Sequence, residues 1–112
     1  MIFITNEDEL KINNGLTALY FYADWLPFHK KMKIMIDKVE DIYKDINFLA
    51  IDIDSFKTSC VRFSIESIPT VLILNNDGKE LKRIVGLTMT SAFKKAFNDV
   101  NKGSNDKKSK DY

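Results

Sequence analysis

The sequence contains one cysteine, Cys60, among its 112 residues. A lone cysteine excludes an intramolecular disulfide, and with it the disulfide-dense scaffolds of small secreted proteins. An excess of charge of one sign is also missing, because 17 Lys and Arg residues balance 16 Asp and Glu residues for a formal charge of +1. Since nucleic-acid binding relies on excess positive charge, we expect no direct nucleic-acid partner.

Long apolar runs and histidine clusters are absent as well. No stretch approaches the ~20 apolar residues that a membrane-spanning helix needs, so we expect no membrane association. The N-terminal run MIFI is soon followed by acidic residues, which is not the pattern of a signal peptide, and we expect a reducing, cytoplasmic location. His29 is the only histidine, without further His or Cys nearby, so we expect neither a metal nor a cofactor.

The residues that are present suit one globular domain. Hydrophobic residues make up 45% of the chain and charged residues 29%, which at this length supports a single core. Two short apolar runs, LTALYFY (16–22) and NFLAIDI (47–53), predict buried strands. Apolar residues recur at helical spacing from Pro27 onward, which predicts a helix between these strands and hence a βαβ unit.

The second half of the chain predicts a helix followed by a hairpin. A short helix is expected over residues 55–63 and a strand over 70–74, with the sequence TVLIL. An Asp-Gly pair within residues 76–78 tolerates the positive φ of a tight turn, so the return strand is predicted over 79–85.

The last predicted element is a helix that begins near Thr88 or Thr90. Its apolar residues, Phe93, Ala96 and Phe97 among them, are spaced by three and four positions. Residues 102–112 lack this spacing and are predicted to form a flexible polar tail. The interpretation is therefore one domain over residues 1–101, which we expect to be monomeric.

Four short motifs narrow this α/β outline to one family. In chain order they are FYADW (21–25), WLPFHK (25–30), SIESIPT (64–70) and RIVG (83–86). Through their order and spacing the sequence resembles the thioredoxin family over roughly residues 1–101. The resemblance implies the thioredoxin fold, with a central mixed sheet of four or five strands sandwiched by helices. It also implies a cis peptide bond before Pro69.

The sequence departs from that family where the family's chemistry takes place. WLPFH stands in place of WCxxC, so that Leu26 occupies the position of the attacking cysteine and His29 that of the resolving cysteine. Tyr20 aligns with the family's buried Asp, and Ala50 with the Lys that pairs with this Asp. Disulfide exchange needs a thiolate nucleophile and a second thiol. We therefore expect no catalytic residue and a loss of oxidoreductase activity.

The same resemblance implies a groove that could still bind a protein or an extended peptide segment. In the family, the backbone of the residue before the cis-proline pairs with an extended substrate segment, and here that residue is Ile68. The predicted groove residues are Trp25, Leu26, Pro27, Phe28, His29, Ile68, Pro69, Val85 and Gly86. Several of them are apolar, and an apolar patch on a small protein is typical of a binding surface.

Two residues leave alternatives open. Cys60 is predicted to act as a small, inert hydrophobic residue in the short helix, but an oxidoreductase that works through Cys60 or through mixed disulfides remains the alternative. A purely structural subunit is a further possibility. His29 is expected in the first turn of the long helix as a neutral imidazole that hydrogen-bonds solvent or a ligand, or as a plain surface residue.

Overall fold

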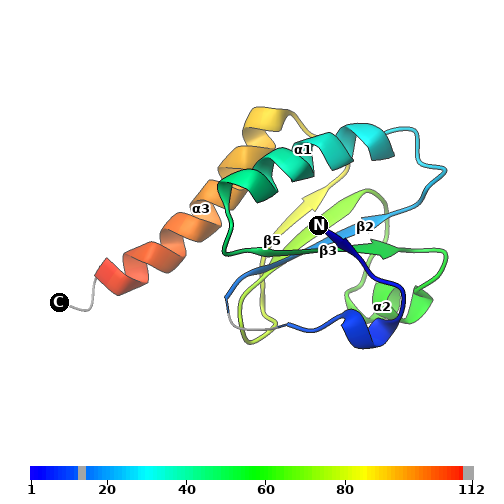
Figure 1. Ribbon diagram of the computed structural model, residues 1–112, viewed down its shortest axis with the longest axis horizontal. Helices are drawn as coiled ribbons and strands as arrows, with labels where there is room; N and C mark the ends of the chain where they lie inside the picture. The colour runs from blue at the N-terminus through cyan, green and yellow to red at the C-terminus, as the bar shows by residue number, and fades with distance from the viewer. Residues whose placement is uncertain (13–14, 110–112) are drawn as a thin grey trace.

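A mixed sheet forms the centre of the molecule. The computed structural model describes residues 1–12 and 15–109, with side chains described as far as Asn101. In these residues five strands lie in the order β1-β3-β2-β4-β5 (Figure 1). The strands are β1 (Ile2–Phe3), β2 (Thr17–Tyr22), β3 (Asn47–Asp52), β4 (Thr70–Leu74) and β5 (Glu80–Val85). β3 is parallel to β1 and β2, whereas β4 is antiparallel to β2 and β5.

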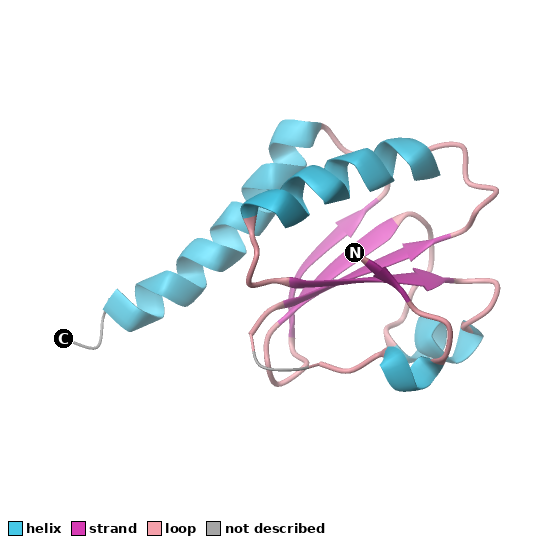
Figure 2. Cartoon of the chain, in the orientation of Figure 1, coloured by secondary structure: helices cyan, strands magenta, loops and turns pink. Residues whose placement is uncertain are grey.

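Helices cover both faces of this sheet, as Figure 2 shows. They are the 3₁₀ helix η1 (Glu7–Glu9) and the α-helices α1 (His29–Ile42), α2 (Lys57–Arg62) and α3 (Thr90–Ser109). α1 and α3 lie against one face, and α2 and η1 lie toward the other. The predicted sandwich is therefore confirmed, with five strands in the described part of the chain.

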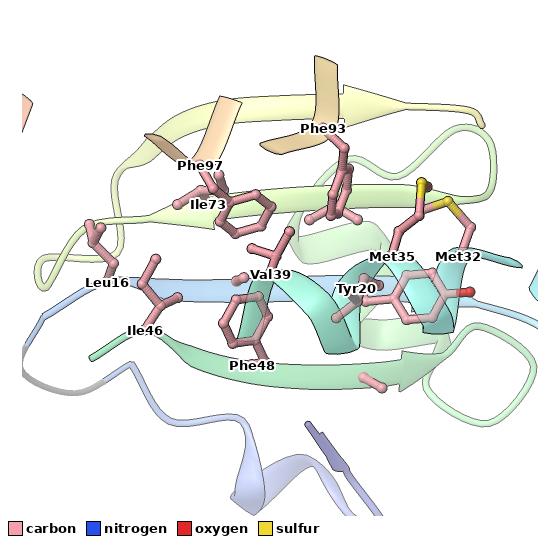
Figure 3. Close-up of a cluster of buried hydrophobic side chains, with 14 of the residues drawn as sticks. Leu16, Tyr20, Met32, Met35, Val39, Ile46, Phe48, Ile73, Phe93 and Phe97 are labelled. Carbon is pink, nitrogen blue, oxygen red and sulfur yellow. The ribbon is translucent and has the colours of Figure 1, made fainter. Parts of the chain in front are cut away.

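The larger core lies between the sheet and the helices α1 and α3 (Figure 3). Met32, Met35 and Val39 of α1 recur at helical spacing and are buried, while the polar residues of that helix lie outside this face. Phe93 and Phe97 of α3 pack with ring centroids 5.1 Å apart, and both are fully buried. Burial of each such side chain stabilises the fold by roughly 1.5–3 kcal/mol.

The smaller core lies on the opposite face of the sheet. Leu19, Phe21 and Leu72 point to this side because alternate residues of a strand face opposite ways. Cys60 and Ile68 pack against it from α2 and from the segment before β4. Two buried faces explain why β2 and β4 consist almost entirely of apolar residues.

Some predicted boundaries differ from the structure. α1 begins at His29, two residues later than predicted. Pro27 and Phe28 lie in the turn before it. α3 continues to Ser109, across the predicted boundary at residue 101, so the helix occupies much of the predicted tail, of which residues 110–112 lie outside the described residues. The short β1 and η1 were not predicted. They carry too few residues to show a period.

Candidate functional site

Strand register brings the predicted groove segments to one end of the sheet. Phe21 of β2 is paired with Thr70 of β4, and Thr70 is in turn paired with Val85 of β5. Consequently β2 ends, β4 begins and β5 ends side by side, which can be followed in Figure 1. We call the residues 25–29, 68–69 and 85–86 at this end the strand-end surface. All nine predicted groove residues belong to it.

The Pro69 segment combines a cis peptide bond with two local hydrogen bonds. The Ile68–Pro69 peptide bond is cis, and Pro69 is buried. The carbonyl of Pro69 accepts a hydrogen bond of 2.7 Å from the N–H of Gly86, and the Thr70 hydroxyl donates one of 2.7 Å to the carbonyl of Ser67. Gly86 has a φ of +82°, which a residue without a Cβ adopts readily.

Ile68 presents a free backbone edge between these interactions. Within residues 1–12 and 15–109, neither its N–H nor its carbonyl has a hydrogen-bond partner. Its side chain is half-buried against the smaller core, which fixes the position of that backbone. An unpaired N–H and carbonyl are the groups that pair with an added extended segment.

His29 contacts Tyr20, a residue that the sequence places in the neighbouring strand. The Tyr20 hydroxyl and the His29 Nδ1 atom lie 2.9 Å apart, and the hydroxyl donates when Nδ1 is unprotonated. The imidazole is half-buried and stacks on the ring of Tyr22 at a centroid distance of 4.8 Å. A buried tyrosine is therefore the partner of Nδ1. The expectation that the imidazole hydrogen-bonds solvent or a ligand stays a prediction, which concerns its other ring nitrogen.

Burial changes the ionisation of the tyrosines in this stack. It raises the pKa of Tyr20 far above the ordinary value, with a smaller contribution from Tyr22. Burial also raises the pKa of Tyr22, and the carboxylates of Asp52 and Asp24 raise it further. Both phenols are neutral at physiological pH and serve as hydrogen-bonding, stacking groups. The place of the resolving thiol is therefore filled by an aromatic stack.

Trp25 is tied to the loop that follows β3. Its indole Nε1–H donates a hydrogen bond of 2.9 Å to Asp54 Oδ2. Asp54 is itself held by its backbone N–H, which donates 2.9 Å to Asp52 Oδ1. Trp25 as a whole nevertheless remains 65% exposed. The bond orients the indole ring at the surface. Asp54 was not among the predicted site residues.

Further apolar side chains are exposed on the strand-end surface and directly after it. Phe28 is 46% exposed and Val85 is 55% exposed, while Leu26 is half-buried. Leu87 and Met89 follow the strand-end glycine and are 39% and 75% exposed, but they were not among the predicted groove residues. Their place directly after the RIVG motif was the signal that could have found them.

Cys60 lies in α2 and, like Ile68, packs against the smaller core. Its side chain is half-buried, so it is more exposed than a residue of the core would be. Burial raises the pKa of its thiol, and the carboxylates of Asp52 and Asp54 raise it further, which disfavours the reactive thiolate. Arg62, the neighbouring cation, lies instead 4.8 Å from the centroid of the Phe63 ring.

Metal and membrane sites are not found in the described residues. No group of three or more His, Cys, Asp and Glu side chains there is arranged to hold a metal ion. Each helix in the same ranges is too short or too polar to cross a membrane. Within this part of the molecule, the strand-end surface offers hydrogen-bonding edges, aromatic rings and apolar side chains, and its loop carries no thiol.

These features define a class: an α/β protein with a parallel βαβ unit, an antiparallel hairpin, and a cis-proline beside the loop that enters α1. A profile of the Thioredoxin family matches residues 4–99, and the chain belongs to the thioredoxin family. It has the thioredoxin fold, and a single cysteine means that it contains no CxxC pair.

Individual thioredoxins agree with this assignment. The chain is 37% identical over 76 residues to the thioredoxin of Chlamydia trachomatis, which covers 68% of this chain and 74% of that protein. It is 34% identical over 89 residues to the thioredoxin of Chlamydia muridarum, covering 78% and 86%. Oxidised thioredoxin from Plasmodium falciparum superposes with a TM-score of 0.81 at 22% identity, covering 89% of this chain and 97% of that one.

Proposed function

We propose that this thioredoxin-family protein does not catalyse dithiol–disulfide exchange and instead binds an extended segment of a partner protein at the strand-end surface. The observation that carries the proposal is the free backbone edge of Ile68 beside the exposed side chains of Trp25, Phe28 and Val85. An extended segment satisfies such an edge with main-chain hydrogen bonds, and its side chains contact the apolar neighbours.

The loss of catalysis follows from the residues at the former thiol positions. Leu26 has no nucleophile, so no mixed disulfide can form there. His29 cannot release a mixed disulfide, and its Nδ1 atom is already engaged by Tyr20. The departure from the family's active site therefore extends from Leu26 and His29 into the buried strand β2, where Tyr20 lies.

The rival function is an oxidoreductase that works through Cys60. Its raised thiol pKa leaves little thiolate at neutral pH. A single cysteine also provides no resolving thiol within the chain. Both features favour the binding role over this rival.

The catalytic part of the proposal is tested by insulin reduction with dithiothreitol. We expect the wild-type protein and a Cys60→Ser variant to match the rate without protein, while a thioredoxin with two active-site cysteines accelerates it. Acceleration by wild type that disappears in Cys60→Ser would establish the rival function.

The binding part is tested with an array of synthetic ten-residue peptides of alternating β-branched residues, followed by calorimetric titration of the peptides that bind. We expect Val85→Glu and Trp25→Ala to weaken binding at least tenfold. Leu81→Glu is the matched control, because Leu81 lies on the same strand and is 42% exposed but belongs to its other end. Equal loss in both β5 variants, or no peptide binding at all, would contradict the proposed site.

A further inference from the structure

A hollow of about 320 Å³ lies beside the strand-end surface, between the loop after β3, α2 and the segment before β4. Ile53, Ile65 and Ile68 supply apolar walls, and Cys60 also lines the hollow. Asp54 and Glu66 line it as well, and both residues are exposed. The hollow thus combines apolar walls with accessible carboxylates.

The position of the hollow links it to the proposed function, on which this inference rests. Ile68 lines the hollow and also presents the unpaired backbone edge. A partner segment paired with that edge would therefore run beside the hollow. Because side chains of an extended segment alternate in direction, a residue next to one that contacts Trp25, Phe28 or Val85 points the other way.

The charges around the hollow favour a cation. The lining includes two acidic residues, Asp54 and Glu66, and one basic residue, Lys57. Asp52 adds a third carboxylate nearby, since it holds the backbone of Asp54. Arg83 also lies near Glu66, but its guanidinium donates to both carboxylate oxygens of Glu80 and to the carbonyls of Phe63 and Ser64.

Acidic groups also act on the Cys60 thiol, which lines the hollow. Burial is the largest cause of the raised pKa of this thiol, and the carboxylates of Asp52 and Asp54 raise it further. The charged groups that act on the thiol are therefore acidic, although Lys57 lines the same hollow.

We propose that the hollow receives a lysine or arginine side chain of the bound partner segment. The methylene stem would lie along Ile53, Ile65 and Ile68, and the charged end would reach Asp54 and Glu66 at the surface. Long basic side chains commonly bury their stems in this way while the charged group stays near water. The partner is thus an extended segment with one basic residue among apolar ones.

The first test uses Cys60 as a probe of charge preference in the free protein. In methanethiosulfonate reagents, the Cys60 thiolate attacks the sulfenyl sulfur, a protein–reagent disulfide forms, and methanesulfinate leaves with the electron pair. We expect the rate ratio of the 2-aminoethyl to the 2-sulfonatoethyl reagent to exceed the same ratio for N-acetylcysteine amide by about threefold or more. In Glu66→Gln the excess should fall, whereas Asp41→Asn, an exposed change on α1, should preserve it.

The second test compares peptides that differ at one position. In the array peptides, each position is replaced in turn by Lys, Arg, norleucine or Glu. At one position we expect Lys and Arg to bind about three- to fivefold more tightly than norleucine, the range for an exposed ion pair, and Glu to bind more weakly still. The preference should shrink in Glu66→Gln, and the basic peptide should slow alkylation of Cys60 by iodoacetamide.

The outcomes separate the inference from the function beneath it. If no peptide binds, both fail. If peptides bind at the strand-end surface but norleucine and Lys are equivalent, or Cys60 is alkylated at the same rate with and without the basic peptide, the basic-residue preference fails while the proposed function stands.

Discussion

The contact between Tyr20 and His29 joins two substitutions that lie nine positions apart in the sequence. Tyr20 is only 2% exposed, so its hydroxyl would be costly to leave without a partner. The Nδ1 atom of His29 supplies that partner at 2.9 Å. Each residue was predicted to lie in the former thiol site, but their contact depends on how α1 packs on β2. The Tyr20–His29 contact therefore could not be predicted from either sequence position alone.

Removing the Tyr20 hydroxyl should weaken the fold measurably. We expect Tyr20→Phe to lower the free energy of unfolding in urea by about 1 kcal/mol, the usual net value of one hydrogen bond. Tyr43→Phe is the matched control, because its hydroxyl makes a longer, exposed bond of 3.4 Å to Asn98. If the two variants lose the same stability, the Tyr20–His29 bond contributes nothing specific.

At the scale of the element, α1 shows why apolar residues alone do not identify a core face. Ile34 and Ile36 belong to the same helix, but Ile34 is 56% exposed and Ile36 is 1% exposed. We expect Ile36→Ala to cost about 2–5 kcal/mol of unfolding free energy and Ile34→Ala no more than about 0.5 kcal/mol. Urea denaturation of the two variants checks this. Similar losses would mean that α1 packs in another register.

Gly86 directly follows β5 and donates a backbone hydrogen bond to Pro69, in the segment before β4. Its φ is +82°, and a Cβ built there would have no atom within 4 Å, so the cost of a side chain is purely one of backbone conformation. We expect Gly86→Ala to destabilise the protein by about 1–2 kcal/mol. Gly86→Asn should cost less, because Asn tolerates positive φ better. Thermal unfolding compares them, and a larger loss in Asn would point to a steric cause instead.

The elements were predicted to different degrees for physical reasons. The bounds of β4 match the predicted 70–74, because a short apolar run between turn residues is distinctive. The end of α3 was misplaced, since its final turns carry no apolar spacing and the prediction relied on that spacing. The strand-end surface could be located by motif, but Asp54 entered it through a tertiary hydrogen bond that no motif contained.

At the scale of the whole molecule, the buried tyrosines predict sensitivity to alkali. Because burial raises the folded-state pKa of Tyr20 and Tyr22, the unfolded chain releases these protons first as pH rises. Their contribution to stability is complete below the unfolded-state pKa of about 10 and is lost above it. We expect the free energy of unfolding to fall from about pH 10 upward, and to fall less steeply in Tyr20→Phe. Identical slopes would contradict this origin.

The hydrogen bond between Trp25 and Asp54 makes the tryptophan an intrinsic fluorescent probe of the hollow. Trp25 is the chain's sole tryptophan, and the carboxylate that its indole contacts also lines the hollow. If a bound cation interacts with the Asp54 carboxylate, the electrostatic surroundings of the indole must change. Occupancy of the hollow should consequently register as a change in intrinsic emission, without any attached dye.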